Sequence, residues 1–362
     1  MSILMLDAIA PWLEGLARGL SAHVPVVALQ HVSISAQRKL GLPRHSVEGD
    51  LTYRTRVFPP GFAGTLAPLF APFVRSGIER EMARLGKAGG AAPHVICPFP
   101  HAERWTRHIP GNRLIYYNVD EYTLYNPAMA EAIRAQEDRL IRRAELTICV
   151  AVHQAQQFRQ RHPDVAERIH HLPHGLGENF LNPAPQDPPT SGLVGYVGNL
   201  GDRVDWDFVD QVVQLAPDLT FEFFGSAGAE SAPWADLRAQ VFARSNVRAP
   251  GPLPHSEVPA AYWHSAVNWM PYVTDHPFNV AASPTKIFDS MGSGRPFVST
   301  AIPDVTPYAD RIQIARSPQE AAAMLRQSAA SHDPQTAIAM RDMARNHLWS
   351  SRGEQLLNLL NP

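Results

Sequence analysis

Short apolar runs alternate with longer segments of helical period along most of this chain. ILMLD (3–7), VICPFP (95–100) and LIYYNV (114–119) are typical of strands, and the same alternation returns from LVGYVGN (193–199) onward. The pattern predicts parallel α/β units. Because 362 residues exceed one typical domain, we expect two doubly wound α/β domains.

A proline-rich segment divides the two halves. LNPAPQDPPTSG (181–192) contains four prolines, no large aromatic residue and no helical period, which is typical of an interdomain linker. We therefore expect an N-terminal domain at 1–180 and a C-terminal domain at 193–345. The last residues, 346–362, have a helical period, and we expect a helix that packs back on the first domain.

The composition is that of a core-forming globular protein, with 45% apolar and 18% charged residues. The net charge of −2 gives no argument for nucleic-acid binding. Residues 1–180 carry a small excess of Lys and Arg, whereas residues 181–362 carry an excess of Asp and Glu. This asymmetry favours different partners for the two halves.

Cys97 and Cys149 lie in apolar runs, so we expect buried thiols rather than a disulfide framework or a metal site. The first residues lack the basic region of a signal peptide, and no window offers the ~18 uninterrupted apolar residues of a spanning helix. These features favour a cytoplasmic protein.

The stretch SPTKIFDSMGSGRPFVST (283–300) has the strongest chemical signal in the chain. Ser283 suits an N-cap and Pro284 the first helical position, which places Lys286 in the first turn and Asp289 on the same face. A lysine at the positive end of a helix dipole predicts a bound anion such as a phosphate, and the carboxylate suits ribose hydroxyls. The alternative is a surface helix on which Lys286 and Asp289 pair with each other.

This stretch resembles the donor-binding signature of GT-B glycosyltransferases, P-x-K-x-x-E-x-x-A-x-G-x-P-V-V. Lys286 matches the lysine, Asp289 stands for the glutamate, Gly292 for the alanine, and Gly294 and Pro296 match directly. Three more segments are similar to segments of that family: GLVGYVGNLGDRVDW (192–206), GPLPHSEVPAAYWHSAVNWMPY (251–272) and HLPHGLGENF (171–180). The subgroup that the chain most resembles is the bacterial polysaccharide transferases of the teichuronic-acid type, and more distantly the xanthan-type β-glucuronosyltransferases.

The resemblance implies two Rossmann-like domains facing across a cleft, with a nucleotide sugar on the C-terminal domain. The residues expected to bind the donor are Lys286, Asp289, Ser283, Thr285, Tyr272, Gly198, Asn199 and His174. Alternatives stay open for several of them, since Tyr272 could be a core residue and Gly198 could serve only a tight turn.

One departure from the family pattern bears on the stereochemistry of the transfer. Many retaining members carry a second acid eight residues before the position of Asp289, where this chain has Ala281. This difference argues against copying a retaining mechanism and favours inversion, with Asn279 and Ser283 available in place of the acid.

An inverting transfer needs a base for the acceptor hydroxyl. The best candidate is Asp120 in IYYNVDEYTLY, just past a predicted strand, with Glu121 as the neighbour to exclude. Asp7, at the end of the first strand, is the second candidate and is expected on the acceptor side. Either acid could instead have a structural role. Asp120, for example, could cap a helix or pair with an arginine.

The sixteen histidines do not predict a metal site. His170, His171 and His174 form the densest group, but His170 and His171 alternate across a predicted strand and no carboxylate completes a ligand set. We expect no metal and no cofactor beyond the nucleotide sugar, with His174 near a donor phosphate. His255 is expected to be a surface residue.

The resemblance thus implies a hexosyltransferase for cell-surface polysaccharide that uses a nucleoside diphosphate sugar, with UDP as the favoured nucleotide. The expected acceptor is a glycan or a polyprenyl-diphosphate-linked sugar. Residues 57–75, an apolar stretch with four phenylalanines, are either a buried loop and helix or an element that touches the inner membrane surface. The alternatives are a UDP-sugar 2-epimerase of the same architecture and a non-catalytic nucleotide-sugar-binding module.

Overall fold

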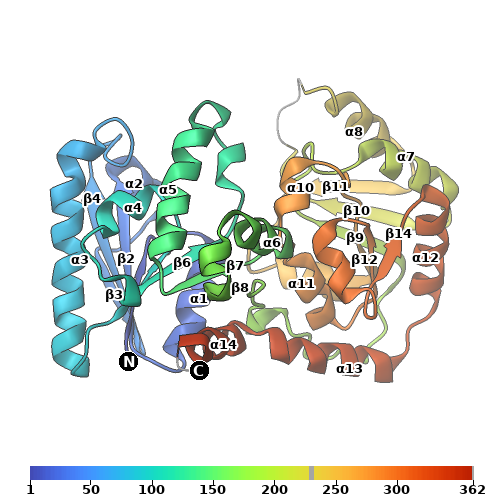
Figure 1. The fold of residues 1–362 in the computed structure, drawn as a ribbon. Helices are drawn as coiled ribbons and strands as arrows, with labels where there is room; N and C mark the ends of the chain where they lie inside the picture. Colours follow the sequence, from blue (N-terminus) through green and yellow to red (C-terminus); the bar gives the residue numbers. More distant parts are fainter. Residues whose placement is uncertain (228–231, 361–362) are drawn as a thin grey trace. The chain divides into compact units, whose positions relative to one another are not determined.

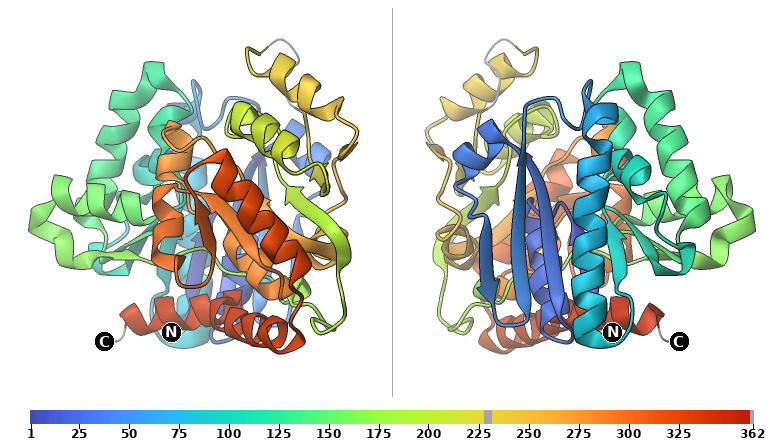
Figure 2. Two further views of the ribbon diagram at one scale, coloured as in Figure 1. Left: turned by 90° about the vertical axis from the view of Figure 1, so that its right-hand side faces the viewer. Right: turned by 90° about the vertical axis from the view of Figure 1, so that its left-hand side faces the viewer.

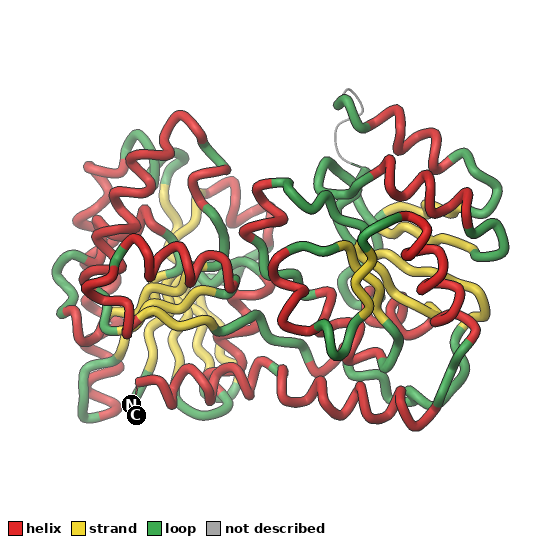
Figure 3. Tube along the Cα trace, turned by 45° about the vertical axis from the view of Figure 1, so that its right-hand side comes forward, coloured by secondary structure: helices red, strands yellow, loops and turns green. Residues whose placement is uncertain are grey.

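The computed structural model describes residues 1–227 and 232–360, which form two compact units. Unit 1 contains Met1–Gly175 and Trp349–Pro362, and unit 2 contains Leu176–Leu348. Each unit is a mainly parallel sheet with helices on both faces (Figures 1 and 3), so the predicted α/β class with two doubly wound domains is confirmed.

Unit 1 is built on an eight-stranded sheet in the order β3-β4-β2-β1-β5-β6-β7-β8. All neighbours are parallel except β3 and β4, two strands that the sequence analysis did not predict. β1 lies between β2 and β5, so the strand order reverses there. The strands are β1 (Ile3–Leu6), β2 (Val26–Ser33), β3 (His45–Glu48), β4 (Leu51–Phe58), β5 (His94–Cys97), β6 (Leu114–Asn118), β7 (Leu146–Cys149) and β8 (Ile169–His171).

Side chains of β1 alternate between two apolar clusters, one on each face of the sheet. Ile3 and Met5 belong to one cluster and Leu4 and Leu6 to the other, which is why this strand reads as a continuous apolar run. The helices of unit 1 are α1 (Pro11–Ser21), α2 (Ile34–Leu40), α3 (Ala67–Gly89), α4 (Glu103–Thr106), α5 (Ala130–Arg143), α6 (Val152–Arg161) and α14 (Trp349–Leu360). Cys97 and Cys149 are buried free thiols, as predicted.

The C-terminal helix α14 packs against α1 at very short range. A Cβ on Gly19 would lie 2.0 Å from the backbone oxygen of Trp349, and a Cβ on Gly353 would lie 2.5 Å from the backbone oxygen of Gly19. The two glycines therefore allow the backbones to touch, and α14 completes unit 1 although unit 2 separates it in sequence.

Unit 2 is a six-stranded parallel sheet in the order β11-β10-β9-β12-β13-β14. Its strand order reverses at β9 and β12. The strands are β9 (Thr190–Val197), β10 (Thr220–Phe224), β11 (Val247–Gly251), β12 (Ser265–Met270), β13 (Phe297–Thr300) and β14 (Gln313–Ala315). The helices are α7 (Trp206–Leu215), α8 (Ala235–Phe242), α9 (Val258–His264), α10 (Pro277–Ala281), α11 (Lys286–Ser293), α12 (Pro318–Ala330) and α13 (Pro334–Ala344).

Short 3₁₀ turns connect the elements of both units. They are η1 (Pro100–Ala102), η2 (Gly111–Arg113), η3 (Tyr122–Leu124), η4 (Pro127–Met129), η5 (Pro163–Arg168), η6 (Glu178–Phe180), η7 (Pro303–Tyr308) and η8 (Arg345–His347). Among residues 1–227 and 232–360, no helix has the length and apolar character needed to cross a bilayer.

The proline-rich segment belongs to unit 2 and is fixed by side-chain bonds. Arg295 donates to the backbone oxygen of Asp187 at 2.9 Å, and Asn182 Nδ2 donates to that of Ser293 at 3.1 Å. β9 already begins at Thr190. The chain passes from unit 1 to unit 2 at Gly175–Leu176, a few residues before the boundary expected at 180.

Candidate functional site

The candidate donor site begins at α11, whose start differs from the prediction. The helix begins at Lys286 with Thr285 as its N-cap, two residues later than a helix capped by Ser283. The prediction that Ser283 caps the helix is therefore wrong. Thr285 makes no side-chain capping bond either, because its hydroxyl donates to Asp289 Oδ2 at 3.2 Å. The predicted end is confirmed, since Gly294 takes a left-handed conformation directly after the helix.

Lys286 lies at the first position of α11, against two tyrosine rings. Its Nζ is 5.6 Å from the ring centre of Tyr196, near the end of β9, and 5.5 Å from that of Tyr272, just past β12. A Cβ on Gly198 would come within 2.9 Å of Lys286 Cε and Nζ, so the lysine occupies space that the glycine leaves open. Parallel α/β sheets bind ligands where their strand order reverses. The structure thus brings Lys286, Tyr272 and Gly198 together at that place in unit 2.

The surroundings of Tyr272 are electrostatically positive. Burial alone would raise the pKa of Tyr272, but the charges of Lys286 and Arg203 and a hydrogen bond with Lys286 bring it below the usual tyrosine value. The Arg203 guanidinium is 5.6 Å from the Tyr272 ring, and its Nε donates to Asn279 Oδ1 at 2.8 Å. Two cations therefore surround one buried phenol, an arrangement that attracts an anion.

Asp289 lies further along α11 and lines a pocket of about 320 Å³. Burial raises the pKa of its carboxyl to about 7, although Lys286 and the Thr285 hydroxyl act in the opposite direction. The volume falls in the range of small-molecule sites, which are mostly apolar with a few placed polar groups. The remaining lining residues are Phe180, Val197, Leu253, His255, Val258, Tyr262, Thr285 and Lys286.

The glycine turn after β9 contacts the neighbouring strand. A Cβ on Gly225, just past β10, would lie 1.7 Å from the backbone oxygen of Gly198. Asn199 is exposed, and its backbone oxygen accepts a hydrogen bond from the Tyr196 hydroxyl at 2.8 Å. Ser283 is partly buried in the short connection between α10 and α11. The turn therefore fixes the Tyr196 ring that contacts Lys286.

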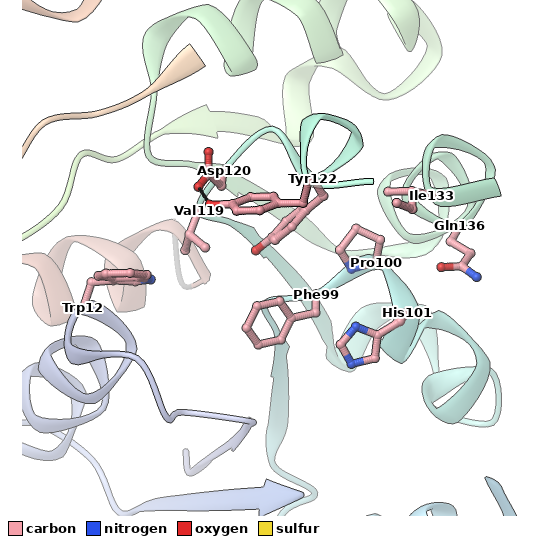
Figure 4. A pocket seen from close by; sticks show the side chains of 10 residues that line it. Trp12, Phe99, Pro100, His101, Val119, Asp120, Tyr122, Ile133 and Gln136 are labelled. Carbon is pink, nitrogen blue, oxygen red and sulfur yellow. Dashed lines mark hydrogen bonds between the residues drawn. The ribbon is translucent and has the colours of Figure 1, made fainter. Parts of the chain in front are cut away.

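Asp120 follows β6 by two residues and lines a pocket of about 400 Å³ in unit 1 (Figure 4). Its Oδ1 accepts from the Glu121 N–H at 2.9 Å, and its Oδ2 accepts a short hydrogen bond from the Tyr125 hydroxyl. Aromatic and aliphatic groups dominate the wall. The other lining residues are Trp12, Phe99, Pro100, His101, Val119, Tyr122, Ile133 and Gln136.

The neighbouring acid, Glu121, is bound into the structure instead. Its Oε1 accepts from the Thr123 N–H at 3.2 Å, and its Oε2 accepts from Gln154 Nε2 at 3.1 Å. Glu121 thereby caps η3. Of the two adjacent acids, Asp120 is the one that lines the pocket.

Asp7 occupies the end of β1, where the strand order of unit 1 reverses. Among the residues that the structure describes, it is the single non-glycine with a positive φ, 52°. Its Oδ1 accepts from the His31 N–H at 2.9 Å and from His31 Nδ1 at 2.8 Å. Both residues line a second pocket of about 380 Å³ that shares Phe99 and His101 with the Asp120 pocket. Strained backbone of this kind concentrates at functional sites.

His174 lies in unit 1, between α1 and α14. Its ring centre is 6.2 Å from that of Trp12 and 6.0 Å from that of Trp349. Burial lowers its pKa to about 4, and the nearby charge of Arg352 acts in the same direction, so the ring is neutral at pH 7. Contact of His174 with a donor phosphate stays a prediction.

Within residues 1–227 and 232–360, no group of three or more His, Cys, Asp or Glu side chains has an arrangement suited to a metal ion. His255 is exposed, as expected, and it also lines the Asp289 pocket.

Comparisons with known proteins identify this architecture. Residues 203–358 match a family model described as "Glycosyl transferase-like". The chain superposes over 100% of its length on 100% of HepE from Anabaena, solved with UDP, with a TM-score of 0.70 at 15% sequence identity. The chain has the GT-B fold. A sucrose-phosphate synthase from Thermosynechococcus elongatus shares it, with a TM-score of 0.68 at 14% identity over 100% of this chain and 98% of that one.

The sequence relationship is narrower. The chain is 26% identical over 184 residues to TuaH of Bacillus subtilis (strain 168), provisionally described as a teichuronic acid biosynthesis glycosyltransferase. The match covers 49% of this chain and 45% of that protein, less than half of its length. The predicted resemblance to GT-B transferases of the teichuronic-acid type is thereby confirmed.

Several residues of these sites escaped the sequence analysis. Tyr196 and Arg203 flank Lys286 and Tyr272, and His31 orients Asp7. Tyr196 and Arg203 lie inside the segment 192–206 that resembles the family, so that segment held a signal for them. His31 had no such signal, because its role depends on the pairing of β1 with β2.

Proposed function

We propose that this chain is a hexosyltransferase that moves a sugar from a UDP-sugar to a hydroxyl group of a glycan or lipid-linked acceptor. The observation that carries the proposal is Lys286 at the start of α11, beside Tyr196, Tyr272 and Gly198. A cation at a helix N-terminus is a site for a diphosphate. The "Glycosyl transferase-like" match, the name of the curated relative and the UDP in the HepE structure support the choice of donor and reaction.

In this proposal unit 2 binds the donor. The diphosphate lies beside Lys286 and the first N–H groups of α11, where Thr285 lines the same pocket. We propose that Ser283 and Asn199 also contact it. Asp289 accepts hydrogen bonds from the ribose hydroxyls, as acids do in dinucleotide folds. The Tyr272 ring and the apolar wall of the pocket exclude water from the nucleotide.

Unit 1 supplies the acceptor side and the base. The acceptor hydroxyl oxygen forms a bond to the anomeric carbon while the bond from that carbon to the diphosphate oxygen breaks. UDP leaves with the electron pair, and the hydroxyl proton passes to Asp120, whose carboxylate is held by the Glu121 N–H and the Tyr125 hydroxyl. Asp7 contacts the acceptor from the neighbouring pocket.

Charge on the leaving group is balanced by Lys286, Arg203 and helix N–H groups, so the proposal requires no metal. Ala281, in place of a second acid, favours inversion of the anomeric centre. A glycan or a polyprenyl-diphosphate-linked sugar suits the aromatic wall of the Asp120 pocket, since aromatic rings pack against the apolar faces of sugars. Contact of residues 57–75 with the cytoplasmic face of a membrane belongs to the same proposal.

The test is thermal unfolding with UDP, GDP and dTDP, followed by a panel of UDP-sugars. We expect UDP to raise the melting temperature most, because a bound ligand stabilises the fold by RT ln(1 + [L]/Kd). Release of UDP that depends on an added acceptor supports transfer. Interconversion of the sugar would instead indicate an epimerase, and binding without turnover would indicate a binding module, so either result overturns the proposal.

A further inference from the structure

Helix α3 presents large apolar side chains to solvent along its first turns. Leu66, the residue before the helix, is 41% exposed, Leu69 is 64% exposed and Phe73 is 58% exposed. Spacings of three and four residues place these side chains on one face of the helix. Isolated exposed apolar residues are ordinary on a protein surface, whereas an aligned row of large ones marks an interaction site.

The same face of α3 becomes basic toward its C-terminal end. Arg80 and Lys87 continue the row at helical spacing, and both are exposed. α3 has two acids, on either side of this face. Glu81 is bonded to Arg84 and Arg54, at 2.6 and 2.9 Å, and the exposed Glu79 lies 3.5 Å from His108 Nε2. The outer face of α3 therefore combines an apolar half with a cationic half.

Helix α2 has the same character and lies at the same edge of unit 1. None of its residues is buried, Ile34 and Leu40 are 43% and 51% exposed, and Arg38 and Lys39 occupy its last turn. α2 and the turn that leads into α3 border the pocket of Asp7, since Leu40 and Gly61 both line it. In Figure 2, right, α2 and the first turns of α3 lie at the same end of unit 1.

We propose that this α2–α3 surface, made of Ile34, Leu40, Leu66, Leu69 and Phe73 with Arg38, Lys39, Arg80 and Lys87, docks on an anionic phospholipid bilayer. The apolar side chains enter the boundary between headgroups and acyl chains, and the basic ones contact lipid phosphates. The inference deepens the membrane contact of the proposed function and extends it to α2 and to the basic half of α3. It places the mouth of the Asp7 pocket at the lipid surface, where a lipid-linked acceptor is found.

Charge favours a bilayer over a second copy of the chain. Unit 1 carries 21 Lys and Arg against 16 Asp and Glu. Two copies that meet through this surface would bring the same four basic side chains face to face, at a cost in repulsion. An anionic bilayer attracts all four.

Vesicle flotation of the full chain tests the inference without any need for transfer activity, so its failure is separate from that of the transferase proposal. The probes are vesicles of phosphatidylcholine alone and of phosphatidylcholine with an equal part of phosphatidylglycerol. We expect binding to the mixed vesicles, weakened by high salt. Leu69→Ser with Phe73→Ser lowers the affinity at least about tenfold, because apolar area no longer leaves water. Arg80→Gln with Lys87→Gln lowers it about twentyfold at low salt.

Leu237→Ser is the matched control, since Leu237 is a 37% exposed leucine on a helix of unit 2. We expect it to bind like the unchanged chain. Equal binding to both kinds of vesicle would overturn the inference, as would unchanged affinity of the two double variants. It would also be overturned by a dimer in solution that the Leu69→Ser, Phe73→Ser variant dissociates, because a second copy would then cover the surface.

Discussion

In each unit, the charged side chains of the pocket have the sign opposite to the net charge of the unit. Unit 2, with 11 Lys and Arg against 18 Asp and Glu, holds the cationic site of Lys286 and Arg203. Unit 1 has an excess of basic residues, yet its strand-end pockets are lined by the acids Asp120 and Asp7. In both units the pocket lies past the carboxyl ends of parallel strands.

The contrast shows that the local arrangement, and not the total charge of a unit, decides which ligand its pocket fits. At the start of α11 the chain uses one of its only three lysines, although it has 29 arginines. A compact ammonium fits between two phenol rings and a glycine, and we expect the wider guanidinium of an arginine to fit there less well. Unit 1 instead sets carboxylates into aromatic walls, a combination suited to hydroxyl groups. In our proposal the first is a phosphate site and the second a hydroxyl site, the two halves that a sugar transfer requires.

The largest expected effect separates the two units by function. Asp120→Asn should lower turnover by about 10²- to 10⁴-fold, the usual range for loss of a general base, and leave the UDP-induced rise in melting temperature unchanged. UDP release in the presence of acceptor and thermal unfolding measure the two quantities. Asp50→Asn, which changes an exposed acid of unit 1, is the matched control and should retain full turnover.

Asp7→Asn tests the same division from the other pocket. We expect it to raise the KM for the acceptor more than it lowers kcat, because Asp7 contacts the acceptor in our proposal. If Asp7→Asn abolishes turnover and Asp120→Asn retains it, the roles of the two acids are reversed.

The next largest effect concerns nucleotide binding by unit 2. Lys286→Met should weaken UDP binding about 100-fold, the size expected for loss of a hydrogen bond to a charged group. Lys286→Arg should not restore binding, because we expect the space beside Gly198 to be too small for a guanidinium. With ¹³C-methylated lysines the chain gives three lysine side-chain signals, and UDP should move only that of Lys286. Lys87→Met is the control. Movement of the Lys39 or Lys87 signal alone would place the nucleotide elsewhere.

Much of the fold could be predicted from the sequence, and the predictions that failed did so for physical reasons. The α/β alternation and the end of α11 followed from local patterns, since apolar runs and Gly294 act within a few residues. The start of α11 did not, because the Thr285 hydroxyl bonds Asp289 instead of the backbone. β3 was missed because none of its four residues is buried, and β4 because its alternating buried positions include the polar Thr55.

The candidate sites divide in the same way. Lys286 and Asp289 lie three residues apart on one helix, so their shared face follows from the sequence. Tyr196 reaches Lys286 from another strand, and His31 reaches Asp7 across a pair of strands, contacts that only the folded sheets create. Sequence patterns therefore give the residues of a site along one element, and pairing of elements gives the rest.

The smallest expected effect concerns pH and is confined to unit 2. Burial raises the pKa of Asp289 to about 7 in the folded state, whereas an unfolded aspartate titrates near 3.9. Between these values the folded chain binds more protons than the unfolded chain, so the free energy of unfolding falls as pH rises.

Asp289→Asn removes this titration. Denaturant unfolding at pH 5 and at pH 8 measures the effect. Between these pH values the free energy of unfolding should fall more in the unchanged chain than in the variant, by about 3 kcal/mol. Bound UDP should reduce the difference, because ribose hydroxyls that donate to the carboxylate favour its charged form. Asp275→Asn, which changes an exposed acid of the same unit, should leave the pH dependence as it is. A pH dependence that Asp289→Asn leaves unchanged would mean that Asp289 is already ionised at pH 5. The site of unit 2 would then hold a carboxylate as well as its cations, and the contrast in charge between the two pockets would be weaker than we infer.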